Sequence, residues 1–393
     1  MPVSAAERAV LDKIDENHLV ELTRSLVRAA GQNPPGEEAA TVAVLADAAA
    51  GFGLDVTAVA VQPGRDNLRV TLTGGDGAGL LVLGHTDVVP VGDGWTKDPF
   101  GGVVADGRIY GRGTSDMKGG LAAALSAMAA LRGTGLSGPV ELAALVDEEE
   151  NGIGIRDYVS AVPAGAFLGC ITAEPTDLQI IVGARGASYL RIDVHGTACH
   201  AGSPGDGANA IYGAAHVVTE VERMHAELAD RRHPLLGPGT FSVGQIQGGS
   251  GGSVVPAECF VIVDRRLLPG ESAAAVLNDV RARIDALRLA GRGLTVDVSM
   301  PMEMPAFETQ ADSPLVRTAE AAVSDAGGPT LPPGGWTAAC DGGFVARDLG
   351  VPVMVLGPGS VAEQAHRPDE SVAIDELVTA ARTYALTALR LLG

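Results

Sequence analysis

Four short runs of apolar residues, each closed by a polar turn, constrain the fold of this chain more than any other feature. They are GLLVLG (79–84), VELAALV (140–146), FLGCITA (167–173) and VPVMVLG (351–357). Continuous apolar strands of this length are typical of a sheet that is buried on both faces. Helical patterns lie between them, such as the stretch after Asp116, where Leu121, Leu125 and Met128 share one helix face. Alternating strands and helices predict an α/β fold with a mixed, largely parallel sheet covered by helices.

The middle third of the chain has a different pattern. It predicts strands and helices in the order β-α-β-β-α-β, with segments at 188–196, 209–228, 240–247, 258–267, 272–287 and 294–300. This order is the ferredoxin-like arrangement. We therefore predict one larger α/β domain formed by residues 1–185 and 302–393. A ferredoxin-like domain is inserted into it at 186–301.

Composition excludes several classes of partner. The net charge of −20 offers no basic stripe for nucleic acid. No apolar run reaches the about 20 residues that a membrane span requires. The first twenty residues lack the layout of a signal peptide, and the four cysteines have neither the spacing of a thiolate zinc site nor that of a disulfide framework. We expect a cytoplasmic protein with reduced cysteines.

Imidazole and carboxylate side chains follow each of the four apolar runs. The first run ends in His85 and Asp87, the second in Asp147 to Glu150, the third in Glu174, and the fourth leads to His366, while Asp116 precedes the Leu121 helix. In open α/β sheets, ligands bind beyond the carboxyl ends of the strands. Clustered buried carboxylates repel one another unless cations neutralise them. The residues therefore predict a metal site.

The kinds of ligand narrow the choice of metal. Imidazole and carboxylate without thiolate suit zinc, and they tolerate cobalt or manganese. A single catalytic zinc needs three protein ligands and an open position. Six candidates that share one bridging carboxylate form two such sites, about 3.5–4 Å apart. The residues alone thus predict a dinuclear metallohydrolase and leave its substrate open.

Longer motifs then show a family resemblance. GHTDVVP, DGRIYGRGTSDMKGG, VDEEENG, AEPT, DRRLLPGE and GPGSVAEQAHRPDE follow one another along the chain. Over nearly its whole length the chain resembles the dizinc metallopeptidases and deacylases, a family that includes acetylornithine deacetylase, succinyl-diaminopimelate desuccinylase, aminoacylase and bacterial glutamate carboxypeptidase. The resemblance implies two divalent metals per chain, a catalytic domain at 1–185 and 302–393, and a lid at 186–301 that also forms a homodimer.

The resemblance also implies metal ligands. His85, Asp116 and Glu174 would hold one metal, and Asp116, Glu149 and His366 the other, with Asp116 as the bridge. Asp87 would hydrogen-bond His85 and fix its tautomer.

The general base is expected within the same acidic turn. Glu148 would take a proton from the attacking water and pass it to the leaving nitrogen. The tetrad 147–150 allows two registers, because Glu148 with Glu149, or Glu149 with Glu150, could be the base and the ligand. The family's order favours the first register.

Further residues are expected to bind the substrate. His200, acting either within its own chain or across a dimer interface, would donate a hydrogen bond to the tetrahedral oxyanion. Asn209 is expected to reach the substrate as well. Arg266 matches the family arginine that grips a substrate carboxylate, although Arg265 could do so instead, since neighbouring residues of a strand face opposite ways. Ser253 departs from the asparagine that the family usually has there.

A glycine turn completes the expected site. Gly357 and Gly359 would bring the backbone close to the substrate, or they form an ordinary turn. The ending of the chain, from 350 onward, is most similar to acetylornithine deacetylase. We expect hydrolysis of a small N-acyl amino acid that bears a carboxylate. A glutamate-type carboxypeptidase or dipeptidase is the alternative, and a non-catalytic metal-binding interaction protein is a remote third.

Overall fold

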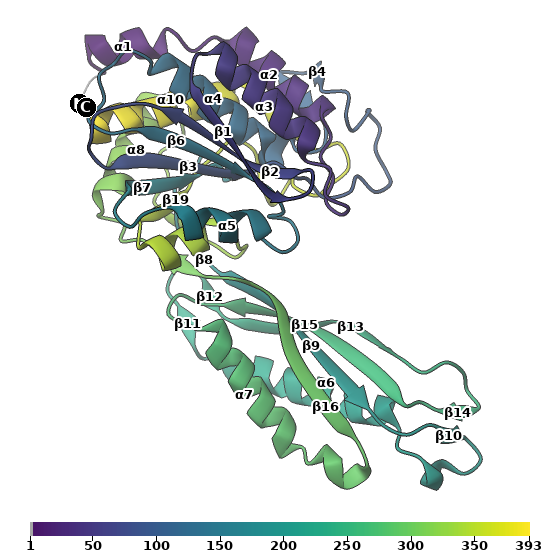
Figure 1. The fold of residues 1–393 in the computed structure, drawn as a ribbon. Coiled ribbons are helices and arrows are strands. Elements are labelled where there is room, and N and C mark those ends of the chain that lie inside the picture. Colours follow the sequence, from purple (N-terminus) through teal and green to yellow (C-terminus); the bar gives the residue numbers. More distant parts are fainter. Residues whose placement is uncertain (1–2) are drawn as a thin grey trace. The chain divides into compact units, whose positions relative to one another are not determined.

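The computed structural model describes residues 3–393, which divide into two compact units (Figure 1). The first unit runs to Val182 and also contains Glu308–Gly334 and Asp341–Gly393. The second contains Gly183–Phe307 and Gly335–Cys340. The predicted boundaries near 185 and 302 lie close to these divisions, but residues 335–340 belong to the second unit, which the sequence did not indicate. The assignment of these units to catalysis and to a lid stays a prediction.

Within the described residues, a nine-stranded sheet has its central strands in the first unit. Its strands are ordered β1 (Asp55–Gln62), β2 (Arg65–Leu72), β6 (Val140–Leu145), β3 (Gly79–His85), β7 (Phe167–Thr172), β19 (Val353–Val355), β8 (Ile181–Ala184) and β17 (Phe307–Glu308), and β18 (Gly334–Trp336) pairs with β8. The central strands β6, β3, β7 and β19 are parallel, whereas β1, β2 and β8 pair antiparallel. The predicted mixed, largely parallel sheet is confirmed. Its parallel strands are those that the four apolar runs predicted.

Helices cover both faces of this sheet. One face carries α1 (Ala5–Leu11), α2 (Glu16–Arg28), α3 (Ala39–Gly51), α4 (Gly119–Ala130), α8 (Pro314–Asp325) and α10 (Ile374–Leu392). The other carries α5 (Ile153–Ala161) and α9 (Gly342–Phe344). A small sheet of β20 (Ser371–Ala373), β5 (Arg108–Tyr110) and β4 (Val103–Ala105) lies beside them. Among residues 3–393, no helix is long and apolar enough to cross a membrane.

Helix α4 is more deeply buried than the sequence pattern predicted. Leu121, Leu125 and Met128 are buried as expected, but so are all the alanines of the helix except Ala129. The helix is mostly glycine and alanine, and these small residues let it lie between the sheet on one side and α2 and α10 on the other. A helix that is apolar all round is buried all round. This close packing sets the position of Asp116, just before α4.

The second unit has the predicted ferredoxin-like topology. In the fully described segment 183–307 the elements follow as β9 (Gly186–His195), α6 (Ala210–Leu228), β13 (Thr240–Gly248), β15 (Glu258–Leu267), α7 (Ala273–Ala286) and β16 (Thr295–Met304). The sheet order is β13-β15-β9-β16, and every pair in it is antiparallel. Two short antiparallel pairs complete the unit, β10 (Cys199–His200) with β14 (Val254–Val255) and β11 (Arg232–His233) with β12 (Gly237–Pro238).

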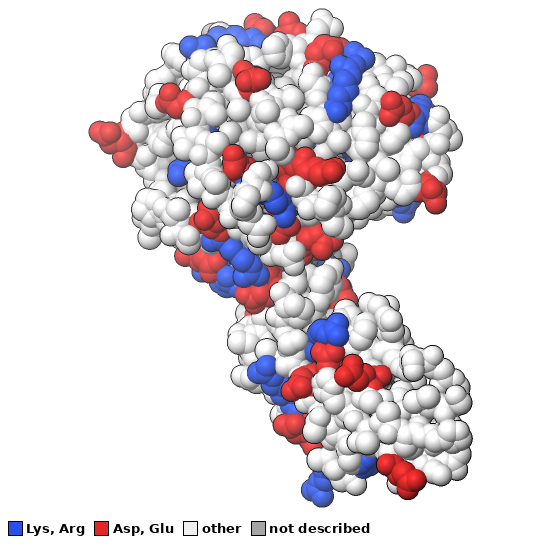
Figure 2. All heavy atoms as spheres, turned by 45° about the vertical axis from the view of Figure 1, so that its right-hand side comes forward, with Lys and Arg blue, Asp and Glu red and all other residues white. Residues whose placement is uncertain are grey.

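The surface agrees with the acidic composition. Figure 2 shows acidic and basic side chains scattered over the face in view, without a continuous basic stripe. The chain has 28 Lys and Arg against 48 Asp and Glu.

Gly120 tests the close packing of α4. A Cβ atom at Gly120 would collide with the backbone oxygen of Ala173, which follows β7. We predict that Gly120→Ala lowers the free energy of unfolding by about 2 kcal/mol, because overpacking costs about 1–3 kcal/mol. Gly51→Ala, in α3 with nothing within 4 Å, is the matched control and should be neutral or stabilising. Denaturant unfolding measures both, and equal effects would contradict the close packing.

Candidate metal centre

The carboxyl ends of the central parallel strands bring the predicted polar residues together. His85 is the last residue of β3, the acidic turn 147–150 follows β6, and Glu174 follows β7. His366 comes from the loop between β19 and β20, and Asp116 from the irregular turn Thr114–Lys118 before α4. The peptide bond between Asp116 and Met117 is cis.

Two groups of possible ligands share Asp116. One is His85, Asp116 and Glu174, and the other is Asp116, Glu149 and His366; in each group the ligand atoms lie within 4.8 Å of one another. His85 Nε2 is 3.2 Å from Asp116 Oδ1, and His366 Nε2 is 3.3 Å from Asp116 Oδ2. Each oxygen of the Asp116 carboxylate thus faces a different histidine. This is the arrangement of a bridging carboxylate.

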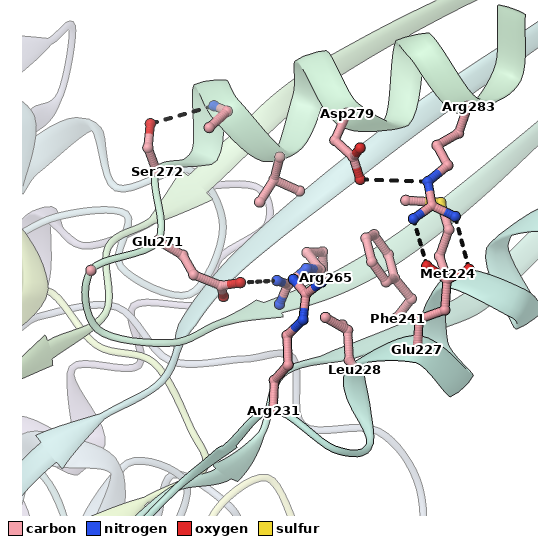
Figure 3. Close-up of a pocket in the computed structure, with 13 residues that line it drawn as sticks. Met224, Glu227, Leu228, Arg231, Phe241, Arg265, Glu271, Ser272, Asp279 and Arg283 are labelled. Carbon is pink, nitrogen blue, oxygen red and sulfur yellow. Dashed lines mark hydrogen bonds and ion pairs between the residues drawn. The ribbon is translucent and has the colours of Figure 1, made fainter.

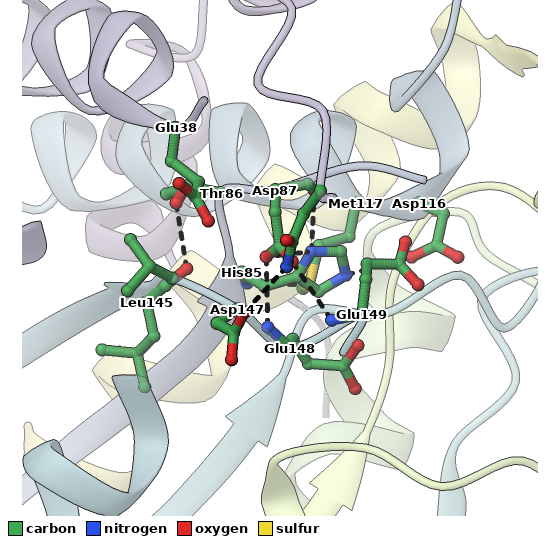
Figure 4. A network of polar contacts seen from close by, with 12 residues as sticks. Glu38, His85, Thr86, Asp87, Asp116, Met117, Leu145, Asp147, Glu148 and Glu149 are labelled. Carbon is green, nitrogen blue, oxygen red and sulfur yellow. Dashed lines mark hydrogen bonds and ion pairs between the residues drawn. The ribbon is translucent and has the colours of Figure 1, made fainter. Parts of the chain in front are cut away.

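An unpartnered oxygen supports a cation here. Glu149 Oε1 is buried and has no hydrogen-bond partner among the described residues, while Glu149 Oε2 lies 3.3 Å from His366 Nε2. A buried carboxylate oxygen without a partner is costly, and a cation would satisfy it. The residues present therefore fit two divalent metals. Figure 4 shows the Glu149 and Asp116 carboxylates next to each other beside the His85 ring.

Asp87 positions this cluster through the backbone as well as through a side chain. Its carboxylate accepts hydrogen bonds from the Glu148 and Glu149 backbone N–H groups, at 3.2 and 3.1 Å. His85 Nδ1 lies 3.0 Å from the Asp87 backbone oxygen and 3.5 Å from its carboxylate. The carboxylate therefore holds the acidic turn, and the nearest partner of the imidazole is the Asp87 carbonyl. The sequence had indicated only the carboxylate for that role.

Neighbouring carboxylates raise the pKa of both histidines in the cluster. Burial disfavours a charged imidazole at His85, yet Glu174, Asp116 and Asp87 raise the pKa of His85 well above its usual value. Hydrogen bonds with Asp116 and then Glu149 raise the pKa of His366 to about 10.

The carboxylates respond in opposite directions. Burial alone would raise the pKa of Asp116, but its hydrogen bonds with His366 and His85 hold that pKa well below the usual range. Burial raises the pKa of Glu148 and Glu174 well above the usual range, and neighbouring carboxylates add to this. Bound cations would favour the charged forms of both.

The two possible registers of the acidic turn differ in the structure. The Glu149 carboxylate belongs to a ligand group, whereas Glu150 is exposed. Glu148 is buried beside the cluster and interacts electrostatically with His85 and Glu174. The geometry therefore agrees with Glu149 as the ligand and Glu148 as the neighbouring free carboxylate.

Gly357 and Gly359 pack against the ligand loops. A Cβ atom at Gly357 would collide with the backbone oxygens of Ala173 and Glu174, and one at Gly359 would collide with Ser115. Gly359 also has a φ of 87°, which other residues rarely adopt. These glycines thus let the loop after β19 approach the segments that carry Glu174 and Asp116. Contact with a substrate stays a prediction.

The remaining predicted residues belong to the second unit. His200 is exposed, and its Nδ1 accepts a hydrogen bond from the Gly202 N–H at 3.0 Å. The Asn209 side-chain oxygen caps α6 by accepting from Ile211 and Tyr212. Arg266 is partly exposed on the open face of β15, and it pairs with Asp264 on the same face at 2.9 Å.

Arg265 has the opposite orientation. It is 1% exposed and lies on the face of β15 that α6 and α7 cover. Strand alternation therefore separates the two arginines as the sequence predicted, and Arg266 is the one on the uncovered face. Ser253 is exposed in the glycine-rich loop before β14.

Sequence reasoning missed the supports of the acidic turn. Asn33 is 3% exposed and donates to both Asp87 and Asp147, at 2.9 Å each. Arg65 donates to Asp147 at 2.9 Å and also binds Glu38, which Figure 4 shows beside the turn. Asn33 lies in the turn-like stretch GQNPPG. That stretch carries no signal that its side chain reaches a distant carboxylate.

Two further carboxylates lie close to the site. Glu370 accepts hydrogen bonds from the backbone N–H groups of Ser115 and Asp116, at 2.9 and 3.1 Å, and pairs with Arg112 at 2.6 Å. Asp341 is 2% exposed, and neither of its oxygens has a hydrogen-bond partner among the described residues. Burial raises the pKa of Asp341 to about 8. The motif that ends in HRPDE contains Glu370, and this was the one available signal for it.

The fold and this cluster first define a class of protein: an α/β metallohydrolase with its polar centre at the carboxyl edge of parallel strands. A family model described as Peptidase family M20/M25/M40 matches residues 81–390. The acetylornithine deacetylase of Aliivibrio fischeri (strain ATCC 700601 / ES114) is 32% identical over 329 residues, 82% of this chain and 83% of that protein. The chain belongs to Peptidase family M20/M25/M40. It is a metallohydrolase that acts on amide bonds.

Solved structures share the fold at low sequence identity. An M20 family metallo-carboxypeptidase from Sulfolobus solfataricus has a TM-score of 0.78 and 20% identity, with 95% of this chain and 99% of that chain covered. A dinuclear metal binding peptidase of the M20 family from Bacillus subtilis has a TM-score of 0.71 and 16% identity, with 96% and 98% covered. At these identities the likeness concerns the fold.

Metal uptake should release protons. In the absence of metal the His366 imidazole holds a proton at neutral pH, because its pKa is raised to about 10, and a ligand imidazole must be neutral. Metal affinity should therefore rise with pH toward about 10, and His366 should contribute about one of the protons released at pH 7. Calorimetry in buffers of different ionisation enthalpy counts these protons.

A pair of variants controls that measurement. His366→Gln should lower the count by about one. His200→Gln, outside the cluster, should leave the count unchanged. A proton count that is the same at pH 6 and pH 10 would contradict the assignment.

Proposed function

We propose that this chain hydrolyses the amide bond of a small N-acyl amino acid with the help of two divalent metals. The observation that carries this proposal is the Asp116 carboxylate between two histidines, with the unpartnered Glu149 oxygen beside it. The similarity to an acetylornithine deacetylase makes N-acetylornithine the first substrate to test.

The same residues would hold the metals that the sequence predicted. His85, Asp116 and Glu174 would bind one, and Asp116, Glu149 and His366 the other. Nitrogen and carboxylate ligands without thiolate favour zinc, with cobalt or manganese as alternatives. When bound, such metals lower the pKa of a water molecule and polarise the scissile carbonyl.

Glu148 is the proposed general base. Its carboxylate would accept a proton from the attacking water and return it to the leaving nitrogen. The backbone of Glu148 is held by Asp87, and Asp87 is held by Asn33, so the carboxylate is positioned before substrate arrives. Burial raises the pKa of Glu148, which favours proton uptake by this group.

Three residues of the second unit are proposed to contact the substrate. His200 accepts a backbone hydrogen bond at Nδ1, so in the neutral ring Nε2 carries the hydrogen, and this N–H would donate a hydrogen bond to an oxyanion. Arg266 would bind the substrate carboxylate, because its guanidinium lies on the uncovered face of β15. Asn209 would contribute through its amide nitrogen, since its oxygen already caps α6.

Self-association and location are also proposals. Exposed apolar side chains of the second unit, among them Tyr212 at 68% and Ile246 at 50%, support a homodimer through that unit. A monomer in sedimentation at micromolar concentration would contradict it. Four free cysteines support a cytoplasmic location.

A peptidase activity is the second candidate. The fold is shared with an M20 family metallo-carboxypeptidase, and a glutamate-type carboxypeptidase or dipeptidase would use the same cluster. Such an enzyme would also need a clamp for the substrate carboxylate, which Arg266 could provide. The two candidate activities differ in the acyl group on the scissile nitrogen. A deacylase removes a simple acyl group such as acetyl, whereas a peptidase removes an amino-acid acyl group.

A substrate panel separates these candidates. We predict that the zinc- or cobalt-loaded protein hydrolyses N-acetylornithine and other N-acyl amino acids at least about tenfold faster than dipeptides, in kcat/KM, a difference of about 1.4 kcal/mol in transition-state binding. Released amino groups are measured. Faster turnover of dipeptides or of N-acylglutamates with an amino-acid acyl group would favour the peptidase.

Glu148 can be tested separately from the metals. We predict that Glu148→Gln lowers kcat by at least about a hundredfold, the usual contribution of a general base. Metal content, measured by elemental analysis, should stay near two per chain. Glu150→Gln is the matched control at an exposed carboxylate and should keep full activity. Unchanged turnover in Glu148→Gln would remove its role as the base.

A further inference from the structure

Two arginines of the described residues are almost completely buried, and they connect different parts of the chain. Arg265, in the second unit, pairs with Glu271 at 2.6 Å, only six residues further along the chain (Figure 3). Arg112, in the first unit, is 2% exposed and pairs with the buried Glu370 at 2.6 Å, 258 residues away. The first pair closes a local turn, whereas the second pair joins two distant segments. Both of these segments carry predicted metal ligands.

The Glu370 carboxylate holds the backbone of the turn that carries Asp116. Its Oε1 accepts hydrogen bonds from the N–H groups of Ser115 and Asp116, at 2.9 and 3.1 Å. The backbone at Asp116 is not helical, with φ −118° and ψ 93°, so the hydrogen bonds of α4 do not set its position. Two consecutive N–H groups that converge on one anionic oxygen form a compact anion site. Glu370 thereby fixes the backbone of the proposed bridging carboxylate.

The Arg112 guanidinium reaches the segment that carries the second histidine. Its Nη1 donates to Glu370 Oε2 and also, at 3.3 Å, to the carbonyl oxygen of Arg367, the residue after His366. Its Cζ lies 5.2 Å from the centre of the Trp95 ring. A planar guanidinium can donate to several acceptors in a fixed geometry, which a lysine ammonium cannot reproduce. Arg112 therefore ties the loop of His366 to Glu370.

His366 needs such support more than His85 does. The side chain of His366 is 53% exposed, whereas that of His85, at the end of β3, is 1% exposed. His366 also has a φ of 63°, a left-handed conformation that is uncommon for residues other than glycine. Such a conformation persists only where the surrounding contacts impose it. The hydrogen bond from Arg112 to the next carbonyl is one of these contacts.

We infer that the Arg112–Glu370 pair is a positioning device for one of the two proposed metals. That metal is the one that Asp116, Glu149 and His366 would hold. One end of the pair fixes the backbone of Asp116, and the other end fixes the loop of His366. The pair thus sets the separation between these two ligands, although it belongs to neither ligand group. This inference rests on the metal ligands of the proposed function.

The other proposed metal should depend on the pair less. Two of its ligands, His85 and Glu174, lie at or just after the ends of strands β3 and β7 in the central sheet. Only Asp116 is common to this metal and to the contacts of the pair. Loss of the pair should therefore weaken one metal more than the other. A general loss of stability would weaken both alike.

Stepwise removal of zinc from the fully loaded protein, by a chelator of known affinity, measures both dissociation constants. His366→Gln identifies which constant belongs to the metal in question. We expect Glu370→Gln to weaken that metal at least about tenfold more than the other, the usual effect of removing a group that orients a ligand. An amide at this position has only one oxygen, so it cannot accept both from the turn and from Arg112 as the carboxylate does.

Glu141→Gln is the matched control. Glu141 is a buried carboxylate that pairs with Arg69 at 2.7 Å, and it lies near the start of β6, at the end of the strand away from the acidic turn. This substitution should also lower the thermal unfolding midpoint, but it should leave the ratio of the two dissociation constants unchanged. The comparison separates positioning from stability.

Arg112→Lys is a second variant in case Glu370→Gln does not fold. It keeps a positive charge beside Glu370, but the ammonium cannot contact Glu370 and the Arg367 carbonyl as the guanidinium does. It should weaken the same metal selectively. A wild-type protein that releases fewer than two zinc ions would overturn the proposed metal centre, and this inference with it. Where the wild type releases two, equal weakening of both metals, or an unchanged ratio in either folded variant, would overturn the inference alone.

Discussion

Repulsion between buried carboxylates is the constraint on which the first unit depends. Asp116, Glu149 and Glu174 converge on two histidines at one edge of the sheet, and Glu148 lies directly beside them. Without counter-charges such a cluster would open, because each anion loses its hydration on burial. The protein supplies part of the compensation through imidazoles and backbone N–H groups. The unpartnered Glu149 oxygen marks the part that it leaves to cations.

Asp87, just after β3, connects the central sheet to the acidic turn that carries Glu148 and Glu149. Its carboxylate accepts two hydrogen bonds from backbone N–H groups of the acidic turn and one from the Asn33 side chain. These protein groups stabilise its negative charge. Asn33 and Arg65 extend the network to Asp147, the first residue of that turn. The orientation of Glu148 and Glu149 is therefore set by residues that need not touch substrate or metal. Such outer contacts commonly tune metal sites.

The sequence predicted most of the architecture because the apolar runs and the strand-end residues are local patterns. Strand alternation also separated Arg265 from Arg266 correctly, although it could not say which one faces the helices. Asn33 and Asp341 were not predicted, because their roles arise only when distant segments meet. The alanine-rich helix α4 was predicted as one-sided, since periodicity alone does not reveal a second layer on its other side. Residues 335–340 belong to the second unit, and no local sequence pattern indicated this.

Strand β15 carries two consecutive arginines on opposite sides of a thin sheet. One side chain is enclosed under two helices, and its neighbour is accessible to water. Consecutive residues of this strand therefore place their side chains in two different environments, one buried and one open to water. A substitution at the enclosed position would therefore change the packing beneath the helices, while one at the outward position would change a water-accessible charge.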